Sequence, residues 1–159
     1  MNTLLYTPIG VVHSPFRETK NMPIQPVACK GIHGAVEVYP KYVEGLKDLE
    51  GFSHIMLLYH FNRTKEYSLT VKPFLDDNDR GVFATRAPSR PNPIGLSTVR
   101  LNKIENGTLF IEDLDILDNT PLLDIKPFIP AVDNRRTNKI GWLEGKSDKF
   151  ASAKNDGRF

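Results

Sequence analysis

Short apolar segments recur along the chain and predict a succession of β-strands. Residues 35–39 read Ala-Val-Glu-Val-Tyr and alternate as the two faces of a half-buried strand do, with Pro40 following at once. Gly, Pro and Asn residues bound most of the other apolar segments. On this pattern we expect strands at residues 10–13, 35–39, 54–61, 69–71, 81–85, 97–104 and 108–111.

Three segments carry the most specific local signals. Residues 54–61 form the nearly continuous apolar run His-Ile-Met-Leu-Leu-Tyr-His-Phe, which predicts a central strand covered on both faces. The dipeptide Asn106-Gly107 between two strand segments predicts a type I′ turn and therefore a β-hairpin. Apolar residues spaced by four and three within residues 42–49 predict a short amphipathic helix that Gly51 ends.

The order of these elements favours a mainly β fold. Many short strands with tight turns and one or two short helices fit a barrel or a sandwich, and of the two we expect a single-sheeted β-barrel. The glycine-rich strand-to-helix turn of a doubly wound dinucleotide-binding fold is absent from the sequence. We expect one domain at residues 1–145, with a surface loop at 21–34, and a loosely structured, dispensable C-terminal tail at 146–159.

Composition and charge exclude several classes of protein. With 40% hydrophobic and 25% charged residues, the chain is typical of an ordered globular protein. Cys29 is the single cysteine, and the four histidines lack the spacing of a ligand pair, so we expect no metal and no disulfide. No apolar stretch reaches the ~20 residues of a membrane span, so we expect no membrane partner and a cytoplasmic location. The net charge of +2 is too small to indicate nucleic-acid binding by itself.

The segment GVFATRAPSRPNPIG at residues 81–95 is the strongest candidate for recognition chemistry. Three prolines restrict the backbone here and can hold the guanidinium groups of Arg86 and Arg90 and the amide of Asn92 in place. Planar guanidinium groups suit carboxylates and phosphates. The alternative is that both arginines pair with local carboxylates and only stabilise the fold, and their spacing leaves both interpretations open.

A second candidate is the segment LDILDNTPLLDIKPF at residues 114–128. Asp118 begins an Asp-Asn-Thr-Pro sequence that is typical of a tight turn. Asp115 and Asp124 have apolar neighbours, where an ionised carboxylate needs a partner. A pairing with Lys126 or with one of the arginines of residues 81–95 would bring the two segments together.

Five segments together resemble the TsaA-like, or TrmO, family. They are IGVVHSPF (9–16), LEGFSH (49–54), GVFATR (81–86), SRPNPIG (89–95) and DIKP (124–127), and the resemblance covers most of residues 3–130. It implies a single-sheeted β-barrel enzyme that binds S-adenosylmethionine (SAM) and forms a homodimer. It also implies tRNA as the partner, methylated on the exocyclic nitrogen of threonylcarbamoyladenosine beside the anticodon.

The resemblance also implies which residues form the site. For SAM these are Gln25, Pro26, Val27, Asn62, Arg63, Arg86, Leu96, Ile116, Leu117, Asp118 and Asn119. For the tRNA substrate we expect Arg90, Asn92 and Lys126. The sequence does not assign a catalytic base, and Asp118 and Lys126 are the candidates.

The chain departs from the family pattern in two ways. Val27 and Asn119 stand where bacterial members often have glycine, and asparagine is the milder change because it tolerates a left-handed backbone. Well-known bacterial members also carry an additional C-terminal domain. Two alternatives to the tRNA methyltransferase therefore stay open: a methyltransferase for a different acceptor, and a non-catalytic SAM-binding module.

Overall fold

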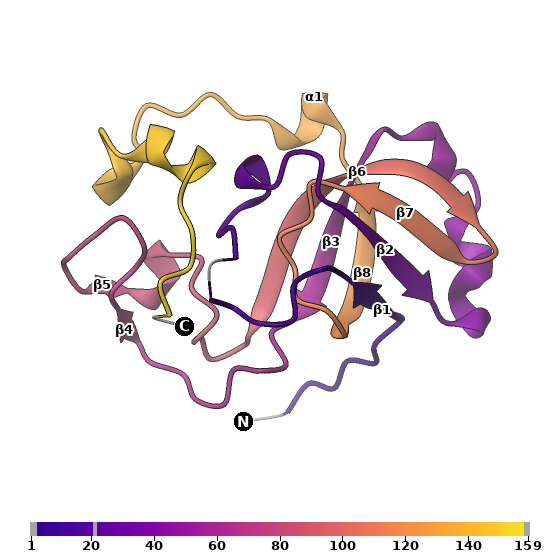
Figure 1. Ribbon diagram of the computed structural model, residues 1–159, viewed down its shortest axis with the longest axis horizontal. Helices are drawn as coiled ribbons and strands as arrows, with labels where there is room; N and C mark the ends of the chain where they lie inside the picture. Colours follow the sequence, from indigo (N-terminus) through magenta and orange to yellow (C-terminus); the bar gives the residue numbers. More distant parts are fainter. Residues whose placement is uncertain (1–2, 21, 158–159) are drawn as a thin grey trace.

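Six antiparallel strands form a closed barrel in the computed structural model, which describes residues 3–20 and 22–157 (Figure 1). Around the barrel the order is β1, β2, β7, β6, β3, β8, and pairing of β1 with β8 closes it. The bounds are β1 Gly10–His13, β2 His33–Val38, β3 His54–His60, β6 Ile94–Glu105, β7 Thr108–Glu112 and β8 Thr120–Pro127. The mainly β, single-sheeted barrel is confirmed. Asn21 of the expected loop and residues 1, 2, 158 and 159 lie outside the described residues.

Shorter elements lie outside the barrel. Strands β4 (Thr70–Val71) and β5 (Arg80–Gly81) pair with each other. Within the described residues the one α-helix is α1, Pro130–Asp133. The 3₁₀ helices are η1 (Pro26–Ala28), η2 (Pro40–Leu46), η3 (Leu49–Gly51), η4 (Val82–Ala84), η5 (Gly141–Leu143) and η6 (Ser147–Ala151).

The hairpin predicted at Asn106-Gly107 is confirmed. Asn106 has a φ of 50° and Gly107 a φ of 78°, the two positive values that a type I′ turn requires. The turn joins β6 to β7, and Glu105 pairs with Thr108 at its base. This turn therefore fixes the register of two of the six barrel strands.

Two expected elements are wrong in type. The helix expected at residues 42–49 is instead the pair of 3₁₀ helices η2 and η3, because the left-handed φ of 66° at Asp48 interrupts it. The strand expected at 81–85 stops at Gly81 and continues as η4. There, the backbone N–H and the hydroxyl of Thr85 both donate to the carbonyl of Val82, which favours a turn over an extended chain.

The strand β3 pairs with β6 and β8. Every strand of a closed barrel has two neighbours, so no strand here is more central than the others. The side chains of β3 alternate: Ile55, Leu57 and Tyr59 are buried in the core, whereas Met56 and Leu58 are half-buried. The expectation that both faces are fully covered is therefore wrong. A single-sheeted barrel has one core inside it, and its outer face packs only against short segments.

Gly95 on β6 lies opposite Tyr59 and leaves room for its ring. A Cβ atom at this position would lie 2.2 Å from Tyr59 Cε2. We expect Gly95→Ala to displace that ring and to lower the free energy of unfolding by about 1–3 kcal/mol, as overpacking of a core does. Chemical denaturation measures the change, with Gly51→Ala as the control, because no heavy atom lies within 4 Å of a Cβ there. Equal losses in the two variants would contradict this account.

Candidate active site

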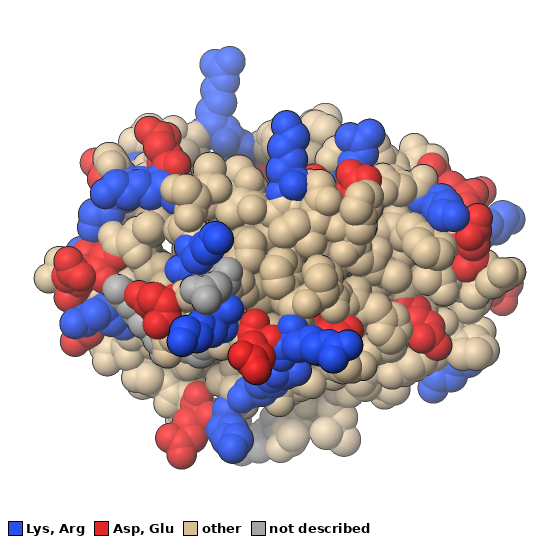
Figure 2. Space-filling model, viewed as in Figure 1, with Lys and Arg blue, Asp and Glu red and all other residues tan. Residues whose placement is uncertain are grey.

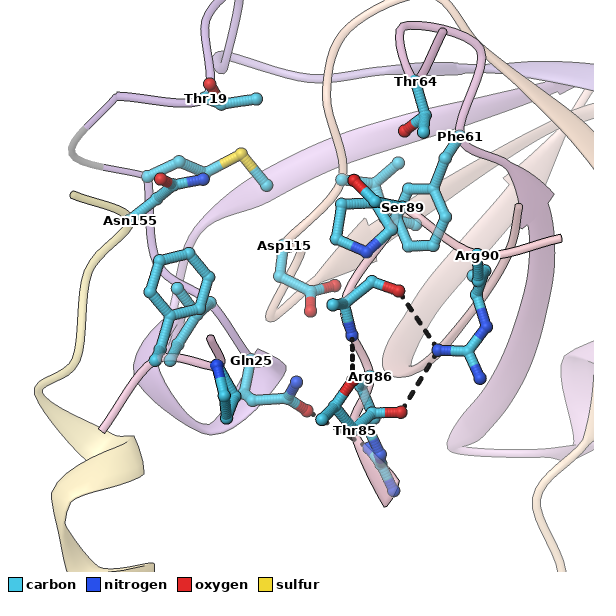
Figure 3. Close-up of a pocket in the computed structure, with 18 of the residues that line it drawn as sticks. Thr19, Gln25, Phe61, Thr64, Thr85, Arg86, Ser89, Arg90, Asp115 and Asn155 are labelled. Atoms are coloured by element: carbon cyan, nitrogen blue, oxygen red, sulfur yellow. Dashed lines mark hydrogen bonds between the residues drawn. The ribbon is translucent and has the colours of Figure 1, made fainter. Parts of the chain in front are cut away.

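A cleft of about 1560 Å³ opens beside the barrel, where irregular segments far apart in the sequence meet. Its walls come from residues 18–20 and 22–27, the chain after β3, residues 83–90 and 94–96, residues 115–117 and the C-terminal region. Figure 3 shows Gln25, Phe61, Arg86 and Asp115 around it. Because single small-molecule pockets measure roughly 300–1,000 Å³, the cleft has space for more than one small group.

Most residues expected in the cofactor site lie on this cleft. Nine of them line it: Gln25, Pro26, Val27, Asn62, Arg63, Arg86, Leu96, Ile116 and Leu117. Arg90, expected to bind substrate, also lines it. Asp118, Asn119, Asn92 and Lys126 do not. The role of each of these residues stays a prediction.

Arg86 and Arg90 make different contacts. Arg86 donates from Nη1 to the side-chain oxygen of Gln25 at 3.1 Å and so links two walls of the cleft. Arg90 donates to the backbone carbonyls of Thr85 and Ala87, both at 3.1 Å, and therefore holds the shape of its own loop (Figure 3). Among the described residues, neither forms a direct ion pair with a carboxylate, so the carboxylate pairing that the sequence left open as an alternative is not what holds them.

The turn at Asp118 has a structural role in the loop. Its carboxylate accepts hydrogen bonds from the backbone N–H of Ser14 and from the amide of Asn119, both at 3.0 Å. Asn119 has the left-handed φ of 61° that asparagine tolerates. Val27 lies in η1 and is not among the residues with positive φ, so its side chain causes no backbone strain. Both departures from glycine are thus compatible with the local backbone.

Lys126 lies on β8 and pairs with Asp124 at 2.8 Å outside the cleft. This hydrogen bond raises the pKa of the Lys126 ammonium group. β8 is absent from the strands expected from the sequence because Pro121 and Pro127 interrupt its alternation. Asp124 and Lys126 are two residues apart on β8 and therefore lie on the same face of the strand, opposite Leu58 and Met56 of β3.

A buried network that the sequence motifs did not reveal reaches the cleft at Asp115. Ser97 of β6 donates to Asp115 Oδ1 at 2.6 Å, and Tyr59 Oη lies 3.0 Å from Ser97 Oγ. Because Ser97 gives its only proton to Asp115, Tyr59 is the donor in the second bond. Burial raises the pKa of Asp115 to about 6 and also raises that of Tyr59. Apolar neighbours of Asp115 were the one signal for this in the sequence.

The sequence profile described as the tRNA-methyltransferase O N-terminal domain matches residues 11–134. The chain belongs to the tRNA-methyltransferase O family. All the barrel strands except the first residue of β1 lie within the matched residues, and so do the walls of the cleft from Gln25 to Leu117. The family resemblance inferred from five short sequence segments is confirmed.

Several relatives in the tRNA-methyltransferase O family are similar over most of this chain. A probable S-adenosyl-L-methionine-binding protein of Pyrococcus abyssi is 56% identical over 98% of this chain and 85% of its own length. The tRNA (adenine(37)-N6)-methyltransferase of Escherichia coli is 38% identical over 84% of this chain and 61% of its own length. The crystal structure of TrmO from Pseudomonas aeruginosa superposes with a TM-score of 0.74 at 38% identity, over 89% of this chain and 63% of that one.

Residues 142–155 follow the part matched by the tRNA-methyltransferase O profile and form what we call the C-terminal strap. Trp142 Nε1 donates to the carbonyl of Ala84 at 2.8 Å, and Lys146 Nζ lies 3.0 Å from the buried carboxylate of Asp76. The backbone N–H of Asn155 donates to Met22 at 2.8 Å. Between these anchors Phe150 lines the cleft, and Figure 1 shows the strap, in yellow, beside the β4–β5 region. Within the described residues, the part of the expected tail from Lys146 to Asn155 is anchored at both of these residues. That the tail is loosely structured and dispensable stays a prediction.

We expect removal of residues 146–159 to weaken binding of the cleft's ligand by roughly tenfold. The deletion removes Phe150 from the wall of the cleft, so the ligand can bury less apolar surface there. A loss of about 1–2 kcal/mol of binding free energy corresponds to a factor of about ten in affinity. Calorimetric titration measures it, with a chain ending at Asn155 as the control, because that chain keeps all three anchors. Unchanged affinity of the longer deletion would restore the expectation that the tail is dispensable.

The charges around the cleft are mixed, with basic groups in excess. Lys20, Arg63, Lys65, Arg86 and Arg90 line it, against Glu18, Glu66 and Asp115. Figure 2 shows a broad uncharged area in the middle of one face, with Lys and Arg side chains, mixed with Asp and Glu, around its edges. Over residues 3–20 and 22–157, no helix is long and apolar enough to span a membrane, and no group of three potential metal ligands is found.

Proposed function

We propose that this protein is a SAM-dependent methyltransferase that methylates the exocyclic N6 of threonylcarbamoyladenosine next to the anticodon of tRNA. One observation carries the proposal. The segments that the family profile covers converge on a cleft with space for both a cofactor and an acceptor base. The relatives named as tRNA (adenine(37)-N6)-methyltransferases in Escherichia coli and human support the reaction class.

The groups that line the cleft suit SAM. Its methionine carboxylate matches the guanidinium group of Arg86, which Gln25 orients. Its adenine matches an apolar wall that includes Phe61, Leu96 and Leu117. When bound, SAM supplies an electrophilic methyl group on a sulfonium. The chain's own residues hold it, orient the acceptor and exclude water from the reacting atoms.

The acceptor side of the cleft suits an RNA loop. Proteins read RNA bases mainly in single-stranded loops, where a base can be splayed out into a pocket. Arg63 and Lys65 follow β3 at the cleft, are exposed, and can contact phosphates. Arg63 Nη1 donates to the carbonyl of Arg17 at 2.6 Å, which already orients its guanidinium group.

The proposal extends to assembly, location and domain limits. A homodimer would extend the basic surface available to tRNA beyond one small barrel. We place the protein in the cytoplasm, where tRNA is modified, and set the SAM-binding domain at residues 1–145. Light scattering at working concentration tests the dimer, and a monomeric mass would overturn that part alone.

The deciding assay uses labelled SAM and two pools of tRNA, one with and one without the threonylcarbamoyl group. We expect label only in the pool that carries the modification. Equal labelling of both pools would overturn the acceptor and keep the methyltransferase. Labelling of neither pool, with SAM binding demonstrated by calorimetry, would overturn the tRNA reaction.

A second candidate, a SAM-binding module without turnover, is favoured by one observation. The 56% identical Pyrococcus abyssi relative is named for SAM binding and not for a reaction. Absence of methyl transfer to any acceptor, despite tight binding, would support it. A chain that binds no SAM would instead support a purely structural role for the Arg86 and Arg90 contacts.

A further inference from the structure

We propose that Asp115 is the catalytic base of the reaction, taking the proton from the acceptor nitrogen as the methyl group arrives. This inference rests on the proposed function. Asp115 is not among the residues expected from the sequence to bind SAM or the substrate. The candidates for the base at that point were Asp118 and Lys126. Four features of the structure carry it: position, orientation, charge and the lack of a comparable carboxylate on the cleft.

The first feature is position. Asp115 lies between the core residues Leu114 and Ile116, which are 0% and 1% exposed, while its own side chain lines the cleft. Figure 3 shows its carboxylate pointing into the cleft, on the side where Gln25 and Arg86 lie. A base must come within hydrogen-bond reach of the proton that it removes. Asp115 meets this requirement for a ligand inside the cleft.

The second feature is orientation by a chain of hydrogen bonds. Tyr59 donates to Ser97, and Ser97 donates to Asp115 Oδ1 at 2.6 Å. Tyr59 and Ser97 are 5% and 2% exposed and sit on barrel strands β3 and β6, so the carboxylate is held from a rigid sheet. A carboxylate has about four lone-pair sites, and the bond from Ser97 uses one of them. The capacity to accept a proton therefore remains.

The third feature is charge. The ionisable groups that face Asp115 are Arg86 from the segment after η4, Tyr59 from β3 and Cys29 after η1. Burial raises the pKa of Cys29 to about 12 and also raises the pKa of Tyr59, so both are neutral at neutral pH. Arg86 opposes the effect of burial on Asp115, whose pKa of about 6 leaves it ionised at neutral pH yet basic enough to take a proton.

The fourth feature is the state of the other carboxylates. Glu18 and Glu66 line the cleft but are exposed, so water solvates them. Asp118 does not line it and holds the backbone of Ser14. Among the described residues that line the cleft, Asp115 is thus the one carboxylate that the barrel shields and orients.

The proton transfer balances without any further reactant. The lone pair of the acceptor nitrogen forms the new bond to the methyl carbon, the bond from that carbon to sulfur breaks, and sulfur keeps the electron pair. The N6–H bond breaks, and its proton moves to a carboxylate oxygen of Asp115. The carbonyl substituent on N6 makes this proton easier to remove, and the carboxylic acid releases it to water after the product leaves.

The first test compares Asp115→Asn with Asp113→Asn. Asp113 lies two residues earlier, outside the cleft, and its carboxylate accepts a hydrogen bond from the backbone of Gly31, which an asparagine oxygen can replace. We expect Asp115→Asn to slow single-turnover methyl transfer at saturating SAM by at least a hundredfold, as loss of a general base does. Affinity for SAM, measured by calorimetry, should change less than threefold. Asp113→Asn should keep both values.

The other outcomes overturn the inference in distinguishable ways. A large loss of SAM affinity with normal transfer at saturation would make Asp115 a cofactor-binding residue. Normal affinity and normal transfer would remove it from the site altogether. An active wild type with an active Asp115→Asn variant overturns this inference alone, whereas an inactive wild type overturns the proposed function and this inference together.

The second test uses Ser97→Ala and the pH dependence of transfer. The hydrogen bond from Ser97 lowers the pKa of Asp115, so its loss should raise that pKa further. We expect the acid limb of the kcat/KM profile, which reports the free enzyme and lies near pH 6 in the wild type, to move to higher pH in Ser97→Ala. Carbon-detected NMR of the Asp115 carboxyl group gives the same pKa without turnover. An unmoved limb together with a moved NMR titration would overturn the assignment.

Discussion

Replacement of Arg86 by alanine is expected to weaken binding of SAM by roughly ten- to hundredfold and to leave the melting temperature of the protein without SAM almost unchanged. A hydrogen bond to a charged group contributes about 1.5–3 kcal/mol, which corresponds to that range of affinity. Within residues 3–20 and 22–157, the one hydrogen bond of the Arg86 side chain goes to the partly exposed Gln25 across the cleft, at 3.1 Å. Its loss therefore removes a ligand contact and little of the fold. Calorimetry and thermal denaturation measure the two quantities.

Arg90→Ala is the matched control because it removes an arginine of the same loop. Arg90 donates to the carbonyls of Thr85 and Ala87, so its loss leaves two loop acceptors without their donor. We expect a lower melting temperature and a smaller effect on SAM affinity than in Arg86→Ala. Arg86→Lys should recover only part of the affinity, since lysine keeps the charge without the planar fork. Strong destabilisation by Arg86→Ala would favour the purely structural interpretation of this side chain.

The barrel could be predicted from the sequence where local physics decides the structure. Period-two alternation identified β2, and Asn106-Gly107 determined the hairpin of β6 and β7, because both signals act within a few residues. The same reasoning failed at β8, whose prolines hide a strand that only pairing with β1 and β3 stabilises. It also failed at residues 42–49, where apolar spacing identified the core-facing side chains but not the interruption at Asp48.

The cleft could be predicted only in part, because it joins segments far apart in the chain. The composition of the proline-rich segment with Arg86 and Arg90 was enough to identify it as a candidate for the site. Ser97 and Asp115 did not, since a serine on a strand and an aspartate in an apolar segment become a pair only after the barrel closes. The C-terminal strap could not be predicted for the same reason, because Lys146 pairs with Asp76, which lies 70 residues earlier in the sequence. Non-local contacts of this kind leave no periodic signal.

The position proposed for the base carries a cost in stability, and this gives the last prediction. The pKa of Asp115 rises from 3.8 to about 6 on folding, so the folded protein binds this proton more tightly than the unfolded chain does. Below pH 3.8 both states are protonated and the carboxyl group costs nothing. The unfolded chain loses the proton near pH 3.8 and the folded protein near pH 6, so the cost grows between these two values. Above about pH 6 the folded state contains a poorly solvated charge, at a cost on the order of 2–3 kcal/mol.

Asp115→Asn removes that charge, keeps the shape and can still accept the hydrogen bond from Ser97. We therefore expect the variant to be more stable than the wild type at pH 7.5, by on the order of 1–3 kcal/mol, and the difference to vanish as the pH approaches 4. Denaturation at a series of pH values measures this directly, and Asp113→Asn should show no such gain. If the variant loses turnover and its gain in stability appears only as the pH rises from about 4 to 6, one ionised carboxylate accounts for both effects. Loss of stability at every pH would instead mean that the network of Tyr59, Ser97 and Asp115 serves mainly to hold the barrel together.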